Sequence, residues 1–528
     1  MKIKFLGAAK SVTGSFFLID TENTRLAVDC GLFQGSKEIK ERNYGEFPVD
    51  PASIDFLILT HAHIDHIGLV PKLCKKGFKG TIYCSYATRK LAEILLPDSG
   101  HIQEMEVERK NRKYKRAGKP LLEPIYTVDD AIKCLNQFVS LNIDEIIPLT
   151  PSIEVRLRDA GHILGSNIIE LWIKENDQKV KLVFSGDLGR PNQPIIKDPA
   201  IIESADYVII ESTYGNRLHK GVGQRKEQLK EIIEKTMKKG GNLIIPSFAV
   251  ERTQDLLYDL NYLYHNGFLN PDIKIYIDSP LAVAATRIFQ ENTEYYDNET
   301  KQLLAEGKHP LKLPNLHFST TQEDSTLLNK IKGGTIIISA SGMCDAGRIK
   351  HHLKHNLWRP ESTILFVGYQ AEGTLGRRIL EGEKLVKIHG EEVAVKAEIA
   401  TIEDYSGHAD KDGLLAWLKG FVSPPKEIFL VHGEEEAQLA FAEAIKNELK
   451  VPVYIPEWLE EIELPHYHEG QVKFQRSDEK IQKAMEAESM YIQTSLKLHT
   501  IFKEKWMNAE YDKIIAYLSR IEEILNEQ

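Results

Sequence analysis

The 528-residue chain contains few cysteines, and their placement excludes two classes of protein. The five cysteines stand at positions 30, 74, 84, 134 and 344, and no two of them form a C-x-x-C pair. An odd, scattered set of this kind argues against a disulfide framework and against a cysteine-ligated zinc site. We therefore expect reduced thiols in a cytoplasmic protein.

Long apolar runs and an excess of positive charge are also missing. No apolar stretch approaches the roughly 18 residues of a membrane-spanning helix, so we expect no membrane partner. The first 20 residues lack the apolar core of a signal peptide and alternate like a strand and a hairpin. The formal net charge of −10 excludes a general nucleic-acid coat and confines any nucleic acid to a locally basic surface.

The pattern of apolar residues changes twice along the chain. Up to about residue 200, short apolar strands end in polar turns, which is typical of packed sheets. From 211 to 395, strands alternate with amphipathic helices, which predicts an α/β unit with a largely parallel sheet. The first pattern returns after 395, so the middle domain is predicted to be inserted into the first. The tail from about 470 has helical periodicity; it either packs on the body or mediates assembly, for example as a homodimer.

The densest group of metal-ligand residue types lies in "THAHIDHIG", residues 60–68. The stretch follows an apolar strand and contains His61, His63, Asp65 and His66. In an extended loop alternate side chains point the same way, so His61, His63 and Asp65 can converge. Neutral imidazoles with few carboxylates suit zinc better than a hard-oxygen metal. Four ligands are too many for one open zinc site but can be shared between two ions.

Three further polar residues end strands elsewhere: His162 in "DAGHILGS", Asp187 in "FSGDLGR" and His432 in "LVHGEE". A carboxylate such as Asp187 can bridge two ions about 3.5–4 Å apart. The competing interpretation is a chance cluster or a solvated histidine-rich turn. Because each member independently ends a predicted strand, we favour a hydrolase with two zinc ions.

These residues carry a resemblance to the metallo-β-lactamase fold. "HAHIDHIG" is similar to the H-x-H-x-D-H motif of that superfamily. Asp29 in "AVDCG", His162 and Asp187 resemble its first, third and fourth motifs, in the expected order.

The inserted segment resembles the β-CASP family of nucleic-acid-cutting enzymes. "ESTYGNRLH" resembles motif A at Glu211, "YSGHAD" motif B at His408, and "LVHGE" motif C at His432. The resemblance covers about residues 1–460 and is closest to bacterial and archaeal relatives of the cleavage-and-polyadenylation-specificity-factor endonuclease. A histidine at motif C, where DNA-processing members have an apolar residue, favours RNA.

The resemblance implies an α/β fold, a metallo-β-lactamase αββα sandwich over residues 1–210 and 396–465. It places an inserted α/β β-CASP domain at 211–395, and the tail at 470–528 is expected to be a helical C-terminal extension. The implied activity is a zinc-dependent ribonuclease that hydrolyses phosphodiester bonds of single-stranded RNA by a two-metal mechanism. Cleavage as an endonuclease, a 5′ exonuclease or both is left open. The alternative is a small-molecule metallohydrolase of the superfamily, which would not need Glu211, His408 or the insertion. A non-catalytic RNA-binding subunit is disfavoured because every ligand position is filled.

The expected roles follow the motifs. One zinc ion is expected on His61, His63, His162 and Asp187, and the other on Asp65, His66, Asp187 and His432. Asp65 and Asp187 are expected to take part in catalysis, and so are Glu211 and His408, without direct metal binding. Asp29 is expected to support a ligand through a hydrogen bond.

RNA contacts are expected at two kinds of site. Residues 109–119, "RKNRKYKRAGK", contain seven Lys and Arg and no acid, and such runs are most often a solvated helix face. They are also the clearest phosphate-binding candidates, at Arg112, Lys113, Lys115 and Arg116. Two glycine-rich turns before helices, whose backbone amides can bind phosphate, add Ser341, Arg348, Thr374 and Arg377. The histidines of "KHHLKHNL" have no acidic partner nearby, so we interpret them as solvated or RNA-facing.

Overall fold

The computed structural model describes residues 1–175, 178–219, 223–370, 373–464, 513 and 516. Apart from residues 513 and 516, the C-terminal extension expected at 470–528 lies outside the described residues. The first compact unit of the chain comprises Met1–His466. Within the described residues, the chain has no helix long and apolar enough to cross a membrane.

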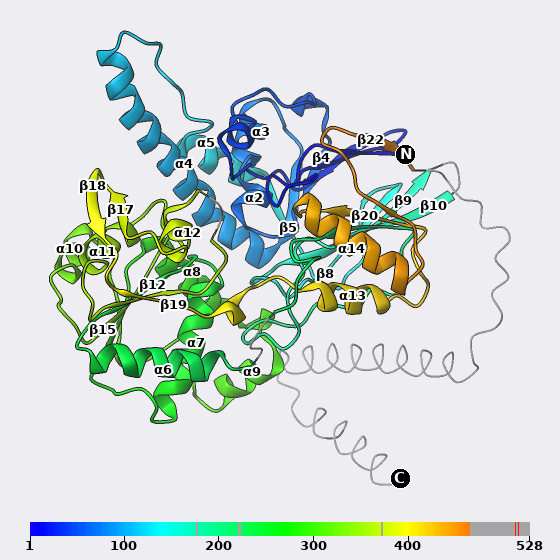
Figure 1. Ribbon diagram of the computed structural model, residues 1–528. Coiled ribbons are helices and arrows are strands. Elements are labelled where there is room, and N and C mark those ends of the chain that lie inside the picture. Colours follow the sequence, from blue (N-terminus) through cyan, green and yellow to red (C-terminus); the bar gives the residue numbers. More distant parts are fainter. Residues whose placement is uncertain (176–177, 220–222, 371–372, 465–512, 514–515, 517–528) are drawn as a thin grey trace. The chain divides into compact units, whose positions relative to one another are not determined.

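Two seven-stranded sheets face each other in this unit (Figure 1). The first has the order β22 (Glu461–Glu463), β1 (Lys2–Phe5), β2 (Phe17–Asp20), β3 (Arg25–Val28), β4 (Phe56–Ile58), β5 (Thr81–Ser85) and β6 (Phe138–Leu141). The second has the order β21 (Val453–Tyr454), β20 (Glu427–Val431), β11 (Tyr207–Glu211), β10 (Gln178–Phe184), β9 (Asn167–Glu175), β8 (Ile153–Asp159) and β7 (Ile147–Thr150). Alternate residues of the strands, such as Phe5, Phe17, Phe184 and Phe429, form the core between the sheets.

Helices cover the outer faces of both sheets. The first sheet carries α2 (Ile64–Ile67), α3 (Val70–Lys75), α4 (Tyr86–Arg116) and α5 (Val128–Cys134), and α1 (Lys37–Glu41) lies in a loop before them. The second sheet carries α13 (Lys411–Lys419) and α14 (Glu435–Glu448). The layers run helix, sheet, sheet, helix, so the expected αββα sandwich is confirmed.

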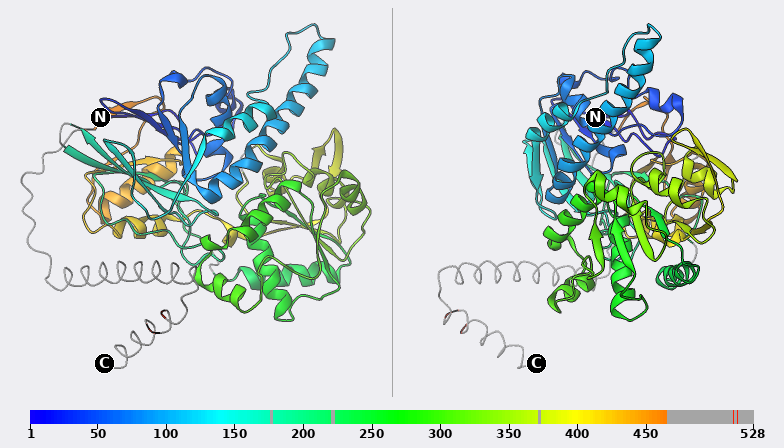
Figure 2. Two further views of the ribbon diagram at one scale, coloured as in Figure 1. Left: turned by 180° about the vertical axis from the view of Figure 1, so that it is seen from behind. Right: turned by 90° about the vertical axis from the view of Figure 1, so that its left-hand side faces the viewer.

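A third sheet, wholly parallel, belongs to the inserted segment and forms a separate lobe, green to yellow in Figure 2. Its order is β14 (Leu316–Phe318), β13 (Lys274–Ile277), β15 (Thr335–Ser339), β12 (Leu243–Pro246), β16 (Thr363–Phe366) and β19 (Glu398–Thr401). The central strands are buried on both faces, as expected for a parallel sheet covered by helices.

One face of the third sheet packs against α6 (Arg225–Lys238), α7 (Arg252–His265) and α8 (Pro280–Glu291), with α9 (Asn298–Ala305) following in the chain. The other face packs against α10 (Gln322–Leu328), α11 (Ile349–Asn356), α12 (Leu375–Leu380) and the hairpin of β17 (Leu385–Ile388) and β18 (Glu391–Ala394). Apolar side chains of α6, α7 and α8 share one buried cluster with α3 and α4 of the sandwich. The inserted domain is therefore packed directly on the sandwich.

The chain returns to the sandwich later than its pattern suggests. The first domain was expected to resume at 396, but β19 pairs in parallel with β16 and completes the third sheet. Strand β20 is the first to pair with the second sheet again, beside β11. An alternating strand pattern specifies a half-buried strand and not the sheet to which the strand is added, so the sequence could not place β19.

Candidate metal centre

The predicted ligands lie after strand ends that meet at one edge of the two facing sheets. Strands β10, β11 and β20 run parallel to one another, so Asp187, Glu211 and His432 all lie at their carboxyl ends. His61 lies just after β4, and His162 lies in the turn between β8 and β9. Side chains from distant parts of the sequence therefore face the same space.

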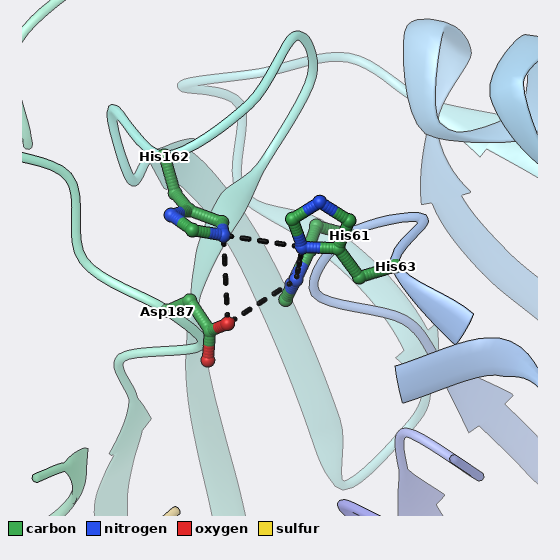
Figure 3. Close-up of side chains that lie close together, drawn as sticks. All are labelled: His61, His63, His162 and Asp187. Carbon is green, nitrogen blue, oxygen red and sulfur yellow. Dashed lines mark hydrogen bonds and ion pairs between the residues drawn. The ribbon is translucent and has the colours of Figure 1, made fainter. Parts of the chain in front are cut away.

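His61, His63, His162 and Asp187 form the first cluster, shown in Figure 3. Nε2 of His61 and Nε2 of His162 lie 3.1 and 3.2 Å from Nδ1 of His63. Both Nε2 atoms lie 3.5 Å from Oδ2 of Asp187. Three nitrogens and one oxygen around a common centre form a donor set that suits zinc.

The imidazoles of the first cluster are neutral. Burial lowers the pKa of His63 to about 4. It also lowers the pKa of His61 and of His162 well below the usual range, although the charge of Asp187 opposes it. Neutral ring nitrogens that face one another this closely cannot all be satisfied by sharing protons. A divalent cation between them would satisfy all of them, so the residues present fit a metal ion.

Asp65, His66 and His432 form a second cluster beside the first. Nε2 of His432 lies 3.3 Å from Oδ2 of Asp65 and 3.3 Å from Nε2 of His66. Asp187 lies between the clusters, because its Oδ1 is 3.2 Å from Nε2 of His66 while its Oδ2 faces the first cluster. Oδ1 is buried and makes no hydrogen bond within the described residues. A carboxylate with one oxygen toward each cluster is suited to bridge two ions.

The backbone divides the histidine-rich stretch between the clusters. An extended loop was expected to align His61, His63 and Asp65, but helix α2 begins at Ile64 and includes Asp65. The helical turn carries Asp65 and His66 toward His432, away from the direction of His61 and His63.

Asp29 supports the second cluster. Its Oδ2 accepts hydrogen bonds from Nδ1 of His66 and from the hydroxyl of Thr60, both at 2.7 Å, and its Oδ1 accepts the Thr60 amide at 2.8 Å. This arrangement directs Nε2 of His66 toward the cluster. Burial opposes the charge of His66, yet Asp187 and Asp29 together raise its pKa well above the usual range. Binding of a cation at His66 therefore requires release of a proton.

Glu211 and His408 form a pair beside the first cluster. Nδ1 of His408 lies 3.1 Å from Oε2 of Glu211, which is buried, and 3.9 Å from Oδ2 of Asp187. Oε1 of Glu211 also accepts the amide of Leu188 at 2.6 Å, which fixes the carboxylate. Burial by itself lowers the pKa of His408, but the charge and hydrogen bond of Glu211 outweigh it and raise the pKa to about 9.

The glycine-rich turns hold the predicted RNA-contacting residues in different ways. Arg348 uses its guanidinium internally, since it donates to Asp278 at 2.7 Å and to the carbonyls of Ser319 and Thr320. Thr374 caps the start of α12, and Arg377 donates to Glu381 at 2.7 Å. The turn at Ser341 lies after β15, in the same group of loops.

The basic run forms the far end of α4, which extends away from the body in Figure 1. Its four predicted RNA contacts, Arg112, Lys113, Lys115 and Arg116, are exposed, and Arg112 pairs with Glu108 at 2.7 Å. The run is thus a solvated helix end, distant in the fold from the strand ends that carry the clusters.

His352 differs from the expectation of a solvated or RNA-facing surface. Its side chain is buried, and its Nε2 lies 2.6 Å from Oδ2 of Asp278, at the end of β13. The acidic partner lies far away in the sequence, so the local pattern could not reveal it. His351 stacks on His389, with 4.6 Å between ring centroids.

Sequence reasoning missed Glu251, which connects the inserted domain to the metal centre. Its Oε2 accepts the amide of Leu164 at 3.1 Å, two residues after His162. Glu251 is buried and adopts a φ of +65°, which is uncommon for a residue other than glycine. The available signal was an acid directly after an apolar strand and a turn, "IIPSFAVE".

Comparison with known families matches three profiles to this chain. "Metallo-beta-lactamase superfamily" matches residues 11–247, "Beta-Casp domain" residues 253–379, and "Zn-dependent metallo-hydrolase RNA specificity domain" residues 392–456. The three matches follow one another in the order of the sandwich, the inserted sheet and the return segment.

Several known proteins are similar over most of the chain. A ribonuclease of Thermus thermophilus is 36% identical over 445 residues, which cover 84% of this chain and 96% of that protein. A protein of Methanocaldococcus jannaschii named transcription termination factor FttA is 31% identical, over 86% of this chain and 70% of its own. An RNase J-like protein of the same organism is 31% identical, over 86% and 97%. A crystal structure of a protein of unknown function from Enterococcus faecalis shares the fold with a TM-score of 0.50 at 12% identity, over 87% of this chain and 99% of that one.

Proposed function

Because the chain belongs to the β-CASP family of metallo-β-lactamase hydrolases, we propose that it is a metal-dependent ribonuclease that cleaves single-stranded RNA. The observation that carries the proposal is the shared carboxylate of Asp187, which joins two metal-ligand clusters beside the Glu211–His408 pair. The RNA specificity profile and the name of the Thermus thermophilus relative support RNA as the substrate.

We propose zinc as the metal, with two ions in each chain. The first ion would be held by His61, His63, His162 and Asp187, and the second by Asp65, His66, Asp187 and His432. Imidazole-rich sites with few carboxylates favour zinc over magnesium or calcium. Such ions, when bound, supply Lewis-acid stabilisation of charge on the phosphate oxygens and an activated nucleophile.

The chain's own residues would orient the substrate and move the proton. His408 has a partner for Nδ1, but no described residue bonds to its Nε2, and the side chain retains 21% exposure. Nε2 is thus available to donate a hydrogen bond to a phosphate oxygen or a proton to the leaving 3′ oxygen. Glu211 would keep the ring in the required tautomer and protonated, and the amide of Leu188 keeps Glu211 in place.

We further propose that residues 1–210 form the first part of the sandwich, 211–395 the inserted domain and 470–528 an extension. The return segment, expected at 396–465, would begin only after β19 (Glu398–Thr401). A cytoplasmic location is also part of the proposal, and the five free cysteines support it.

The test is incubation with 5′-labelled and 3′-labelled single-stranded RNA, with and without a chelator. We expect cleavage that the chelator abolishes and added zinc restores, and that an Asp187→Asn variant lacks. A ladder of internal products indicates an endonuclease, and mononucleotides released from the 5′ end indicate an exonuclease. Absence of RNA cleavage by zinc-loaded protein, together with hydrolysis of small esters or lactams, would overturn the proposal.

A further inference from the structure

We propose that Phe248 and Tyr369 form a shelf on which a base of single-stranded RNA stacks, next to the metal centre. The proposal deepens the ribonuclease function and rests on it. Phe248 lies after β12 and Tyr369 after β16, at the same edge of the third sheet. Their side chains are 40% and 42% exposed, although they follow strands that are buried on both faces.

The ring of Phe248 lies against Gly342. A Cβ on Gly342 would lie 2.9 Å from Cδ2 and from Cε2 of the ring, and one on Gly368 would lie 4.0 Å from Cε2. Any side chain at 342 would therefore displace the ring. The supported ring presents its remaining surface to solvent, which is the arrangement of a stacking platform.

The loop that carries Tyr369 is fixed to the same place by Gln370. The buried amide of Gln370 donates to the carbonyl oxygens of Gly342 and Gly368, at 3.0 and 3.2 Å. The side-chain oxygen of Gln370 lies so close to Gly376 that a Cβ there would come within 1.8 Å. Tyr369 is thus held beside Gly342, the residue against which the ring of Phe248 lies, which lowers the cost of ordering the shelf when a base binds.

The shelf is connected to the metal centre through Glu251. Phe248 precedes Glu251 by three residues, at most about 11 Å of chain. Glu251 in turn binds the amide of Leu164, beside the ligand His162. The hydroxyl of Thr253 donates to the carbonyl of Phe248 at 2.7 Å and closes this loop.

A cation lies on an aromatic ring that neighbours His408. The guanidinium of Arg217 stacks on the ring of Tyr214, 5.0 Å from its centroid, and Tyr214 lies 5.8 Å from the ring of His408. No carboxylate within the described ranges pairs with Arg217. The pKa of Tyr369 is raised by burial and by the charge of Glu434, while Arg377 and Arg217 lower it, so these cations act on the shelf as well. Stacking rings beside cations are what a single-stranded RNA backbone and its bases require.

The experiment uses a cleavage-resistant phosphorothioate RNA in which 2-aminopurine is moved one position at a time. With zinc-loaded full-length protein, we expect quenching at one position near the scissile linkage. Phe248→Leu and Tyr369→Leu should abolish the quenching and weaken binding about 5- to 100-fold, the range for the loss of one base stack. Phe248→Trp should keep the quenching. Phe318→Leu is the matched control, because Phe318 is 44% exposed on β14 at the far edge of the same sheet.

Zinc content and Tm report on the centre and on the fold without involving the shelf. Zinc content should be unchanged in both leucine variants, and Tm should stay close to that of the wild type. Unchanged RNA affinity and quenching in Phe248→Leu would overturn the shelf, as would an equal loss in Phe318→Leu. A wild-type protein that shows the quenching but never cleaves RNA would refute the ribonuclease function and leave the shelf intact.

Discussion

Replacing Glu211 by glutamine should reduce RNA cleavage by an amount that depends on pH. The change keeps the shape and an acceptor for the amide of Leu188, but it removes the negative charge that faces Nδ1 of His408. Glu211 contributes most to the raised pKa of His408, which is about 9, and Asp187 and Asp65 contribute less. Without that charge, burial opposes the imidazolium, and the pKa of His408 should fall to its ordinary value of about 6.5 or below.

The size of the effect follows from the fraction of His408 that is protonated. At pH 8 this fraction is about 90% for a pKa of 9 and about 3% for a pKa of 6.5, a ratio of about 30. At pH 6 the ratio is less than about twofold, because His408 is mostly protonated in the wild type and in the variant. A raised pKa keeps the imidazolium up to higher pH, so the loss must grow as pH rises. Cations bound at Asp187 lower the pKa of His408 in both proteins, which moves the onset of the loss to lower pH.

The assay is single-turnover cleavage of labelled RNA by the wild type and by Glu211→Gln between pH 6 and pH 9. The ratio of the wild-type cleavage rate to the Glu211→Gln rate at each pH cancels the titrations that both proteins share. Asp278→Asn is a matched control, because it weakens a second buried bond between a carboxylate and a histidine, at His352, away from the metal centre. The Asp278→Asn change should lower Tm, and the ratio of the wild-type cleavage rate to the Asp278→Asn rate should not change with pH.

The His408→Ala variant completes the test. It should lower turnover by about 10²- to 10⁴-fold, the range for removal of a general acid, with zinc content unchanged. The double variant with Glu211→Gln should be little worse, since the two residues act as one unit. The reasoning fails if Glu211→Gln loses the same activity at every pH, or if His408→Ala loses its zinc.

The metal content, one glycine and the basic end of α4 can each be tested separately. Metal analysis should find about two zinc ions per chain and about one in His162→Ala, and a wild-type value of one after zinc loading would refute the bridged arrangement. Gly31→Ala should lose metal as well as stability, because its Cβ would lie 1.6 Å from the carbonyl oxygen of Asp65; Gly45→Ala, whose nearest contact is 3.7 Å, should retain both. Replacing Lys113, Lys115 and Arg116 by glutamine should weaken the dependence of RNA affinity on salt. The slope of log affinity against log salt concentration should become shallower by about 0.7 for each phosphate that the variant no longer neutralises. An unchanged slope would show that this end of α4 does not bind RNA.

Much of the metal centre could be predicted from the sequence, because local patterns carry the information. His61, His162, Asp187 and His432 each follow an apolar strand, and polar residues at strand ends are placed at a sheet edge whatever the rest of the fold does. The sandwich and its parallel insertion could be predicted for the same reason, since alternation and helical periodicity are local properties.

Partnerships between distant segments could not be predicted. The bond between His352 and Asp278 spans 74 residues, and the bond between Glu251 and Leu164 spans 87. Arg348 has the sequence context of a phosphate contact, yet its guanidinium is taken up by Asp278 and two carbonyls.

The sequence by itself determined which residue types end which strands, and hence the supply of metal ligands and the fold class. The tertiary structure alone decided that Asp65 faces His432, that β19 completes the third sheet, and that two aromatic rings are left exposed beside the centre. Periodicity records whether a side chain is buried, whereas its neighbours are set by the packing of elements that are far apart in the chain.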